Sequence, residues 1–485
     1  MRQKNAIMKI GDRMNDKYKT PPLTILSDEV DETSPNNDFI TEQINKIENT
    51  LNTYNINAKV VEVKVGPLDI LYALEFAMGQ KVDKILNIKD EIGFALGTKD
   101  VSILIPIPGT SKIGIELPTK TSNVYLRKAL DDKTLKEIKE FKVPAILGKD
   151  PIGNTISVDL SKNNKLLING VSGVGKSMLI NSIIMSNLIL KKPDEVKFLI
   201  VDTKRVEFSS YNGIPHLICP IISEYNQIIS TLNKIREEIA YRINKFQHTG
   251  TKNINQYNEY VKEHNNELEY MPYLVIIIDE LTDVYTNDNN LISNLIVDIA
   301  VKSKMTGICQ IITTNGINKE IISQELKEII PFRITFITTT AEESRIIIDQ
   351  EGAEKLHGKG EMLIKIAGKE ECIRAKNITL LDEEINRTTT YIKNQMSAEY
   401  NEKFIKTEET KQTPKYKKKD ELYNTIVDFV VKTQKASASL LQRKFKMGYN
   451  QAATMIDKLE ENGIIGPATG NSKPREVLVK YSKEE

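Results

Sequence analysis

The sequence is poor in the residues that most often build metal sites and disulfides. It has no tryptophan, only three cysteines and four histidines among 485 residues. Cys219, Cys309 and Cys372 lie far apart and show no C-x-x-C spacing. This pattern argues against a zinc site or a disulfide framework and is typical of a reducing cytoplasm.

Long apolar runs and a strong charge of one sign are also lacking. No stretch approaches the ~18 apolar residues of a membrane helix, so we expect a cytoplasmic protein with no integral membrane anchor. Because 67 basic residues balance 66 acidic ones, the formal net charge is +1. Any nucleic-acid contact must therefore come from local basic patches.

Composition and hydrophobic periodicity divide the chain into five segments. Apolar residues at helical spacing over 38–54, β-rich stretches at 58–65, 70–76 and 101–106, and a helical pattern at 82–97 predict a small α+β module. Further on, a Lys/Glu/Thr-rich stretch precedes a short block with helical periodicity. The predicted segments are a flexible tail (1–37), an α+β module (38–142), a central domain (143–393), a linker (394–420) and a C-terminal helical domain (421–485).

The central domain alternates short apolar strands with longer helical periods. The expected strands are 165–169, 197–202, 273–279, 309–314 and 334–338. Fully apolar strands are typical of a sheet buried on both faces, and the alternation predicts an α/β fold with a parallel sheet covered by helices.

A phosphate-binding loop is the strongest local signal. Residues 170–177 fit the pattern G-x-x-x-x-G-K-[ST], follow a predicted strand and open a predicted helix. Its backbone N–H groups and the helix N-terminus would bind the phosphates of ATP, Lys176 would reach the β- and γ-phosphates, and Ser177 would bind Mg²⁺. The alternative is a glycine-rich turn that matches by chance. The nucleotide-binding residues are Gly170, Val171, Ser172, Gly173, Val174, Gly175, Lys176, Ser177 and Met178.

Two acids end the strand 273–279 and supply a second signal. The carboxyl ends of parallel strands are where α/β folds bind ligands. Asp279 is expected to hold magnesium, and Glu280 to act as general base toward the attacking water. The alternative is a strand end with solvated acids. Asn315 or Thr314, after a third strand, could sense the γ-phosphate, and the charged stretch 202–207 could contact nucleotide or a neighbouring subunit.

Several stretches resemble the FtsK/SpoIIIE family of DNA translocases beyond these general motifs. They include Val65-Gly66-Pro67, Gly148-Lys149-Asp150 with Gly153, the stretch 213–217, the stretch 358–363, and 439–443 with 448–450 and 472–476 near the C-terminus. The resemblance implies a RecA-like P-loop ATPase motor, preceded by an alpha module and followed by a winged-helix gamma module. It also implies a homo-oligomeric ring, expected to be a hexamer, around double-stranded DNA.

The C-terminal block is expected to read DNA through a helix-turn-helix. Its second helix would place Asn450, Gln451 and Thr454 toward the major groove, with Lys473 and Arg475 on the wing near phosphates. In the family, this module reads a short oriented sequence. The alternative is a winged helix that binds protein.

The sequence departs from the family pattern in several places. Chromosomal members usually carry N-terminal membrane helices, which are not found in this sequence. Lys304 stands where the family usually has arginine, and Asn315 stands where it usually has glutamine. Gln451 and Thr454 occupy two positions of the recognition helix at which the family often has arginine. Candidates for an arginine finger from a neighbouring subunit are Arg333 and Arg345, with a structural ion pair as the alternative for each.

Two other functions stay open at this point. One is a coupling ATPase that exports DNA during conjugation, which would not need an oriented-sequence reader. The other is a partition or initiation protein that uses ATP as an assembly switch. Continuous ATP turnover stimulated by duplex DNA would separate a motor from the switch.

Overall fold

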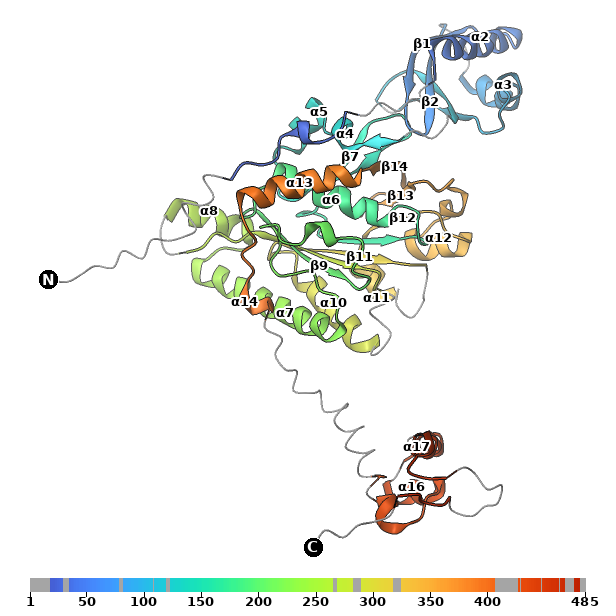
Figure 1. Cartoon of the computed structure of the whole chain (residues 1–485). Helices are drawn as coiled ribbons and strands as arrows, with labels where there is room; N and C mark the ends of the chain where they lie inside the picture. Colours follow the sequence, from blue (N-terminus) through green and yellow to red (C-terminus); the bar gives the residue numbers. More distant parts are fainter. Residues whose placement is uncertain are drawn as a thin grey trace, which may run out of the picture. The chain divides into compact units, whose positions relative to one another are not determined.

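The computed structural model describes residues 18–28, 35–77, 82–107, 109–118, 123–264, 268–281, 289–316, 324–405, 426–427, 429–445, 447–461, 463–466 and 475–479. The chain divides into two compact units, residues 1–406 and 407–485. Each unit has its own hydrophobic core, and Figure 1 traces the elements of both.

The first unit begins with a small α+β module. Its strands form an antiparallel sheet in the order β1-β2-β4-β3. Ile47, Leu51 and Ile92 of the helices pack on this sheet in one core. Strand β4 lies outside the prediction because Gly114 and Glu116 interrupt its apolar pattern. The elements are α2 (Asn37–Thr53), β1 (Ala58–Val65), β2 (Asp69–Phe76), η2 (Val82–Ile88), α3 (Lys89–Leu96), β3 (Ser102–Leu104) and β4 (Ile113–Pro118).

The larger part of this unit is built on a ten-stranded mixed sheet. Its order is β7-β6-β14-β13-β12-β8-β11-β10-β9, with β5 beside β14. Strands β12, β8, β11, β10 and β9 run parallel to one another, whereas β13, β14, β6 and β7 are antiparallel neighbours. The strands are β5 (Val124–Tyr125), β6 (Pro144–Lys149), β7 (Thr155–Asp159), β8 (Lys165–Asn169), β9 (Val196–Asp202), β10 (Tyr273–Asp279), β11 (Ile308–Thr314), β12 (Phe332–Thr335), β13 (Glu361–Lys365) and β14 (Ile373–Thr379).

Helices cover both faces of this sheet, as the α/β prediction requires. Alternate residues of one strand face opposite sides: Val275 and Ile277 of β10 join one core, and Ile276 joins the other. Figure 1 shows α6 and α13 over one face and α7 and α10 over the other. The helices are α4 (Leu126–Ala129), α5 (Asp132–Ile138), α6 (Lys176–Leu190), η3 (Ser209–Tyr211), α7 (Tyr225–Thr249), α8 (Ile254–His264), α10 (Asn289–Lys302), α11 (Gln324–Ile329), α12 (Ala341–Ile348), η4 (Ala353–Lys355), α13 (Asp382–Gln395) and α14 (Glu402–Ile405).

The predicted parallel sheet is confirmed for the central strands, but two details differ. The antiparallel strands lie outside the prediction because polar residues such as Arg374 and Asn377 interrupt their apolar runs. Strand β12 ends at Thr335, earlier than the expected 338. There the backbone N–H of Phe336 still donates to Asn169 O (2.9 Å), but the N–H of Thr338 donates to Ala353 O (3.3 Å), so the chain has left the sheet.

Parts of the predicted flexible tail and of the predicted linker pack against the first unit. Tyr18 and Leu26 are buried in the core beside α13, and the backbone N–H of Ser27 donates to Glu384 Oε1 (2.7 Å). Beyond α13, Phe404 is buried, and the N–H of Asn401 donates to Ile218 O (2.8 Å). Apolar anchors within a polar composition therefore extend this unit into the expected tail and linker.

The N-terminal module is joined to the large sheet through its β1–β2 turn. The backbone N–H of Asp69 donates to Pro151 O (3.1 Å), in the turn between β6 and β7. A Cβ on Gly66 would lie 1.9 Å from the same Pro151 oxygen, so only glycine allows this approach. Arg374 Nη1 of β14 also donates to Asp69 Oδ2 (2.9 Å). Two stretches that carry the family resemblance thus meet at this junction.

The second unit is a small helix-turn-helix domain. Helix α16 (Ala438–Phe445) packs on α17 (Tyr449–Glu461), and Leu441, Ala452 and Leu459 lie in their common core. Isolated β-bridges join Ala436 to Arg475 and Ile465 to Val477. Two such helices with short β-pairing form the predicted winged-helix arrangement.

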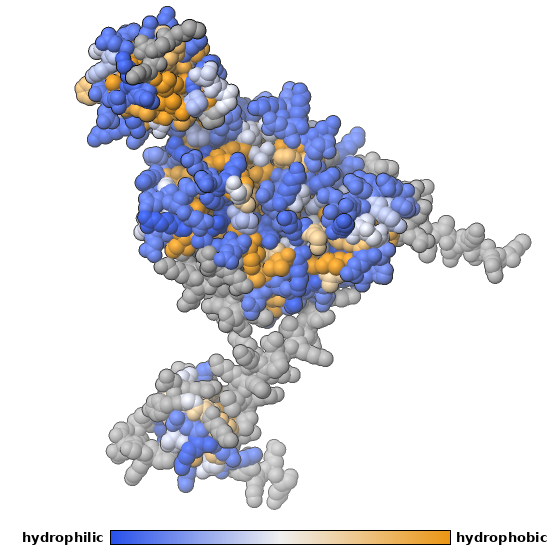
Figure 2. Space-filling view, turned by 180° about the vertical axis from the view of Figure 1, so that it is seen from behind, coloured by the Kyte–Doolittle hydropathy of each residue, from blue (hydrophilic) through white to orange (hydrophobic). Residues whose placement is uncertain are grey.

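The surface of the first unit is mixed in character. On the face shown in Figure 2, hydrophilic residues cover most of the surface, with smaller apolar areas between them. The N-terminal module exposes large apolar side chains, of which Phe94 is 91% exposed. Within the described ranges, none of the helices is both long and apolar enough to span a bilayer.

Candidate active site

The phosphate-binding loop lies between β8 and α6 of the large sheet. Gly175 has a φ of 122°, a conformation that L side chains rarely adopt. A Cβ there would lie 3.1 Å from Phe336 Cε1 and 3.2 Å from Asn377 Nδ2. The carbonyl oxygen of Gly175 accepts a hydrogen bond from Asn377 Nδ2 (3.0 Å) on β14. Packing from β14 and from the residue after β12 therefore shapes the end of the loop.

The ammonium group of Lys176 lies inside this loop. The residue is 5% exposed, and its Nζ donates to the carbonyl oxygens of Gly170 (2.5 Å) and Val171 (3.2 Å). Ser177 follows in the first turn of α6. A buried cation at a helix N-terminus, beside several backbone N–H groups, has the chemistry that binds phosphate.

The two predicted acids lie at the carboxyl end of β10, at the same edge of the sheet. Thr313 of β11 joins them, because its Oγ1 donates to Asp279 Oδ1 (2.7 Å) and accepts from the N–H of Glu280 (2.7 Å). The pKa of Asp279 is raised to about 6, chiefly by burial and also by the nearby carboxylates of Glu280, Asp202 and Glu207, against the lowering effect of the Thr313 hydrogen bond. A buried carboxylate that resists ionisation is one that a bound cation would stabilise.

A basic residue from the neighbouring strand contacts the second acid. Glu280 has a φ of 51° and is 8% exposed. Its Oε2 forms an ion pair with Lys204 Nζ, which follows β9. Lys204 belongs to the charged stretch whose sequence suggested a nucleotide or subunit contact, but no pattern in the sequence connects it to Glu280.

The two residues expected to sense the γ-phosphate, Thr314 and Asn315, lie in different environments. Thr314 is buried, and its Oγ1 donates to Asn169 Oδ1 (3.1 Å) at the end of β8. Asn169 Nδ2 in turn donates to Thr335 Oγ1 (3.3 Å). Asn315 is exposed directly after β11, at the edge that carries the phosphate-binding loop. Of the two candidates, Asn315 is therefore the one placed to meet a ligand.

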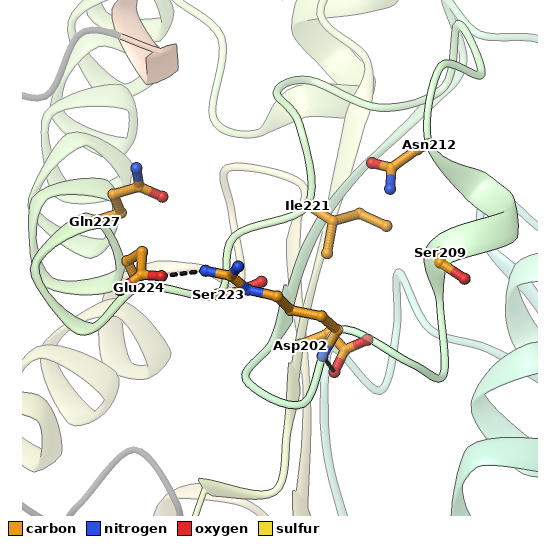
Figure 3. A pocket seen from close by; sticks show the side chains of 8 residues that line it. Asp202, Ser209, Asn212, Ile221, Ser223, Glu224 and Gln227 are labelled. Carbon is orange, nitrogen blue, oxygen red and sulfur yellow. Dashed lines mark hydrogen bonds and ion pairs between the residues drawn. The ribbon is translucent and has the colours of Figure 1, made fainter.

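A polar cavity of about 320 Å³ lies beside the end of β9 (Figure 3). Glu224, before α7, pairs across it with Arg205. Asp202 Oδ1 accepts hydrogen bonds from the backbone N–H groups of Lys204 (3.1 Å) and Arg205 (2.9 Å). The remaining lining residues in Figure 3 are Ser209, Asn212, Ile221, Ser223 and Gln227.

The two candidate arginine fingers differ in their surroundings. Arg333 is 7% exposed, and its Nη2 donates to Asp349 Oδ2 (2.6 Å), which favours the structural ion pair. Arg345 is exposed and pairs with Glu351. Lys304 lies near Lys165 at the start of β8, on the edge opposite the phosphate-binding loop. Of the two candidates, Arg345 is therefore the one whose side chain lies on the surface.

The second unit exposes part of the predicted DNA-reading face. Thr454 is exposed on α17, and Arg475 forms an ion pair with Glu460 of the same helix. Asn450 and Gln451 lie on α17, but their side chains are outside the described part of the chain, as is Lys473. The structure therefore places Thr454 on the surface and ties Arg475 to α17.

The sequence predicts the loop and the acids, but it does not predict the contacts that hold them in place. Thr313, Lys204 and Asn377 each contact a predicted residue from another strand or strand end. A threonine within an apolar strand reads as ordinary β-structure, so its link to two acids emerges only from the strand order.

Comparison with known proteins adds family relationships to this geometry. Family models match residues 20–119 (FtsK alpha domain), 125–355 (FtsK/SpoIIIE family) and 417–480 (FtsK gamma domain). The chain is 38% identical over 485 residues to the DNA translocase FtsK of Staphylococcus epidermidis and 39% identical over 486 residues to that of Bacillus anthracis. Each match covers 99% of this chain and 60% of the relative, so the chain spans about three-fifths of the length of these curated relatives.

A solved structure is also similar to the chain. It is the pCW3 conjugation coupling protein TcpA in its monomer form with ATPγS, at 19% identity and a TM-score of 0.48. The likeness covers 72% of this chain and 99% of that chain.

Proposed function

The chain belongs to the FtsK/SpoIIIE family, and we propose that it is a motor that couples ATP hydrolysis to movement along double-stranded DNA. One observation carries this proposal. The phosphate-binding loop after β8 and the acid pair after β10 lie at the same edge of one sheet, and Thr313 of the strand between them holds both acids.

The side chains at this edge have complementary tasks in ATP hydrolysis. Lys176 would stabilise the negative charge that develops on the transferring phosphoryl group. Ser177 and the buried Asp279 offer the hydroxyl and carboxylate oxygens that suit Mg²⁺, which when bound neutralises phosphate charge. Glu280 would accept the proton of the attacking water, and Asn315 would contact the γ-phosphate.

We propose a ring of identical subunits, expected to be a hexamer, with ATP bound where subunits meet. Such a ring would need a cation from a neighbour to complete the site. Arg345 is the better candidate of the two arginines, because Arg333 is buried in its ion pair with Asp349. The exposed side chain of Arg345 can exchange its partner Glu351 for a phosphate at small energetic cost.

The second unit is proposed to bind duplex DNA through α17. Glutamine pairs best with adenine, and threonine offers a hydroxyl and a methyl group, whereas arginine reads guanine. Because Gln451 and Thr454 stand where family members often carry arginine, we expect a less guanine-rich site. Selection of bound sequences from a random duplex pool tests this; strong recovery of a guanine-rich site would contradict it.

Triplex displacement on linear duplex DNA is the experiment that tests the motor. A translocating protein strips a third strand from the duplex only when ATP is hydrolysed. We expect displacement with ATP, none with a non-hydrolysable analogue, and none with the Lys176→Ala variant. A single turnover followed by a stable ATP-bound assembly, without displacement, would instead favour the assembly switch.

Removal of residues 421–485 separates the motor from the reader. We expect DNA-stimulated hydrolysis and displacement to persist, with the strong salt dependence of phosphate contacts. Loss of displacement in a truncated protein that is still folded and oligomeric would contradict this division of tasks.

A further inference from the structure

We propose that Lys359 binds the α-phosphate of the nucleotide held by its own subunit, as a cation that the phosphate-binding loop itself does not supply. The inference rests on the proposed ATPase function and deepens it, because it assigns a residue to the nucleoside side of the site. The observation that carries it is a turn of residues 358–360, directly before β13, that lies against Gly175 of the loop.

The strand directions bring this turn to the edge of the sheet that carries the loop. Strand β12 runs parallel to β8, and β13 and β14 follow as successive antiparallel neighbours. The amino end of β13 and the carboxyl end of β14 therefore lie at the same edge as the carboxyl end of β8, where the loop begins (Figure 1). A Cβ on Gly175 would lie 3.5 Å from Gly360 Cα, so the turn and the loop are in contact.

Two consecutive residues of β14 fix the turn beside the loop. The backbone N–H of Asn377 donates to Gly360 O (2.8 Å), while the side-chain Nδ2 of the same residue donates to Gly175 O (3.0 Å). Lys376, which is 3% exposed, donates through its Nζ to Lys359 O. Hydrogen bonds from the sheet therefore set the place of Lys359 relative to the loop.

The backbone of the turn is strained at Lys359. Gly358, Lys359 and Gly360 have φ values of 72°, 51° and 85°, so three successive residues are left-handed. Glycine adopts this conformation readily, whereas lysine adopts it at a cost in free energy. Such strain persists only where the surrounding contacts impose it, and it is concentrated at ligand-binding sites. A lysine held between two glycines in such a turn points to a role for its side chain.

The side chain of Lys359 is available to an anion. It is exposed, and within the described ranges it takes part in no ion pair. The acid nearest to it along the chain, Glu361, is 1% exposed and pairs with Arg374 and His357 instead. The ammonium group of Lys359 can therefore bind a phosphate without first leaving a carboxylate.

The order of the strands determines which phosphate Lys359 would meet. The acid pair follows β10, on one side of β8, and the turn precedes β13, on the other side. In the proposed reaction, Asp279 and Glu280 act at the γ-phosphate. A triphosphate that lies along the loop with its γ-phosphate toward these acids has its α-phosphate and its nucleoside on the side of the turn.

The same corner of the loop contains an unsatisfied acceptor. Asn377 is 3% exposed, and its Oδ1 has no hydrogen-bond partner among the described residues. A buried acceptor without a donor lowers stability. The ribose hydroxyl groups of a bound nucleotide would bring donors to this side of the loop, which supports a nucleoside here.

The test compares the binding and turnover of ATP with the binding of ADP in the full chain. The α-phosphate is present in both nucleotides and does not react, so a contact with it contributes to binding in the ground state and the transition state alike. We expect Lys359→Met to raise the KM for ATP and the Kd for ADP by about tenfold each, with kcat within about twofold of wild type. Lys359→Arg keeps the cation and should keep both affinities.

The chain offers a matched control in the same pair of strands. Lys369 is exposed in the turn between β13 and β14, at the edge opposite the loop. Lys369→Met makes the same change of charge and size there, and its affinities should equal those of the wild type. An equal loss of affinity in Lys369→Met and Lys359→Met would show that the net charge is responsible, and would overturn the proposal.

A second variant separates the charge of Lys359 from its backbone conformation. Lys359→Gly removes the cation but suits a left-handed turn, so it should lose affinity as Lys359→Met does. Wild-type affinity in Lys359→Gly would show that methionine only disturbs the turn, and would overturn the proposal. Weaker binding of ATP with unchanged binding of ADP would place the lysine at the γ-phosphate and would overturn the assignment.

The failure of this inference is distinguishable from the failure of the proposed function. If the wild type binds and hydrolyses ATP and Lys359→Met has the same KM and the same Kd for ADP, only this inference fails. If the wild type neither binds nor hydrolyses ATP, the proposed function fails. Thermal unfolding of each variant verifies that it is folded.

Discussion

The two halves of the large sheet hold different features of the molecule. In the parallel half, strands β8, β10 and β11 end at one edge and bring together the phosphate-binding loop, the acid pair and Thr313. In the antiparallel half, β14 and the β6–β7 turn contact the N-terminal module through Arg374 and Pro151. Parallel strands present all their carboxyl ends on one side, which suits a catalytic site, whereas antiparallel strands present turns at both edges, which suits docking.

The halves are nevertheless joined at the phosphate-binding loop. Asn377 of β14 donates a hydrogen bond to Gly175 O, and a Cβ on Gly175 would lie 3.2 Å from Asn377 Nδ2. A movement of the antiparallel half would therefore reach the loop directly. If the division of work holds, changes in the parallel half should abolish chemistry with the fold intact, and changes in the antiparallel half should act mainly on docking and stability.

The largest effect is expected from Lys176→Ala in the parallel half. Loss of the cation that stabilises the transferring phosphoryl group should lower ATP hydrolysis by at least about 10³-fold. Thermal unfolding should change little. The exposed Lys162→Ala, in the turn before β8, is the control and should retain full activity. Hydrolysis within tenfold of wild type would remove Lys176 from the mechanism.

Glu280→Gln should reduce turnover by about 10²- to 10⁴-fold, because an amide cannot accept the proton of the attacking water. ATP binding should be retained, and ATP-bound oligomers should accumulate on DNA. Filter binding and native mass measurement follow both properties. A variant that fails to bind ATP would show that Glu280 has a structural or metal-binding role.

The contrast between the halves also explains what the sequence could predict. Strands β8 and β10 are continuous apolar runs with chemistry at their ends, so their bounds match the prediction. Strands β13 and β14 contain the buried Glu361 and Lys376 and the half-buried Arg374, which pairs with Glu361 across the two strands and with the distant Asp69. Nothing local in the sequence marks such residues as buried.

The contacts within the site follow the same rule. Residue types at fixed spacing predicted Lys176, Asp279 and Glu280, because their chemistry depends on the loop and the strand that carry them. The ion pair between Lys204 and Glu280 depends on β9 and β10 being neighbours, although more than seventy residues separate them in the chain. Strand order is a property of the whole sheet, and local periodicity does not encode it.

Gly66→Ala tests the docking role of the antiparallel half. A Cβ 1.9 Å from Pro151 O forces the two turns apart, at a cost of about 1–3 kcal/mol, typical of overpacking. We expect faster hydrogen exchange at the backbone N–H of Asp69, which donates to Pro151 O, with nucleotide binding largely retained. Gly448→Ala, where an added Cβ meets no atom within 4 Å, is the control. Loss of nucleotide binding in Gly66→Ala would show that the halves are not separable.

The smallest effect concerns Glu116, which lines a cavity of about 510 Å³ near the same junction, together with Asp69, Glu361 and Arg374. The pKa of Glu116 is raised to about 6, chiefly by burial and also by Asp69, against the lowering effect of Arg374. The folded state therefore holds a proton more tightly than the unfolded state, and stability should fall as the pH rises from about 4.5 to about 6. Above that range the ionised carboxylate of Glu116 continues to lower the stability of the folded state.

Glu116→Gln removes this ionisation and should stabilise the first unit at pH 8 by about 1 kcal/mol, since partial exposure reduces the ~2 kcal/mol that the full pKa difference implies. At pH 4.5 the variant and the wild type should be nearly equal. Glu62→Gln, in the same small sheet, is the control of opposite sign, because a hydrogen bond from Lys112 lowers the pKa of Glu62. Denaturant unfolding at the two pH values measures both variants. Equal stability of Glu116→Gln and wild type at pH 8 would show that Arg374 or water already stabilises the ionised Glu116 carboxylate. The contact between the N-terminal module and the large sheet would then not depend on pH.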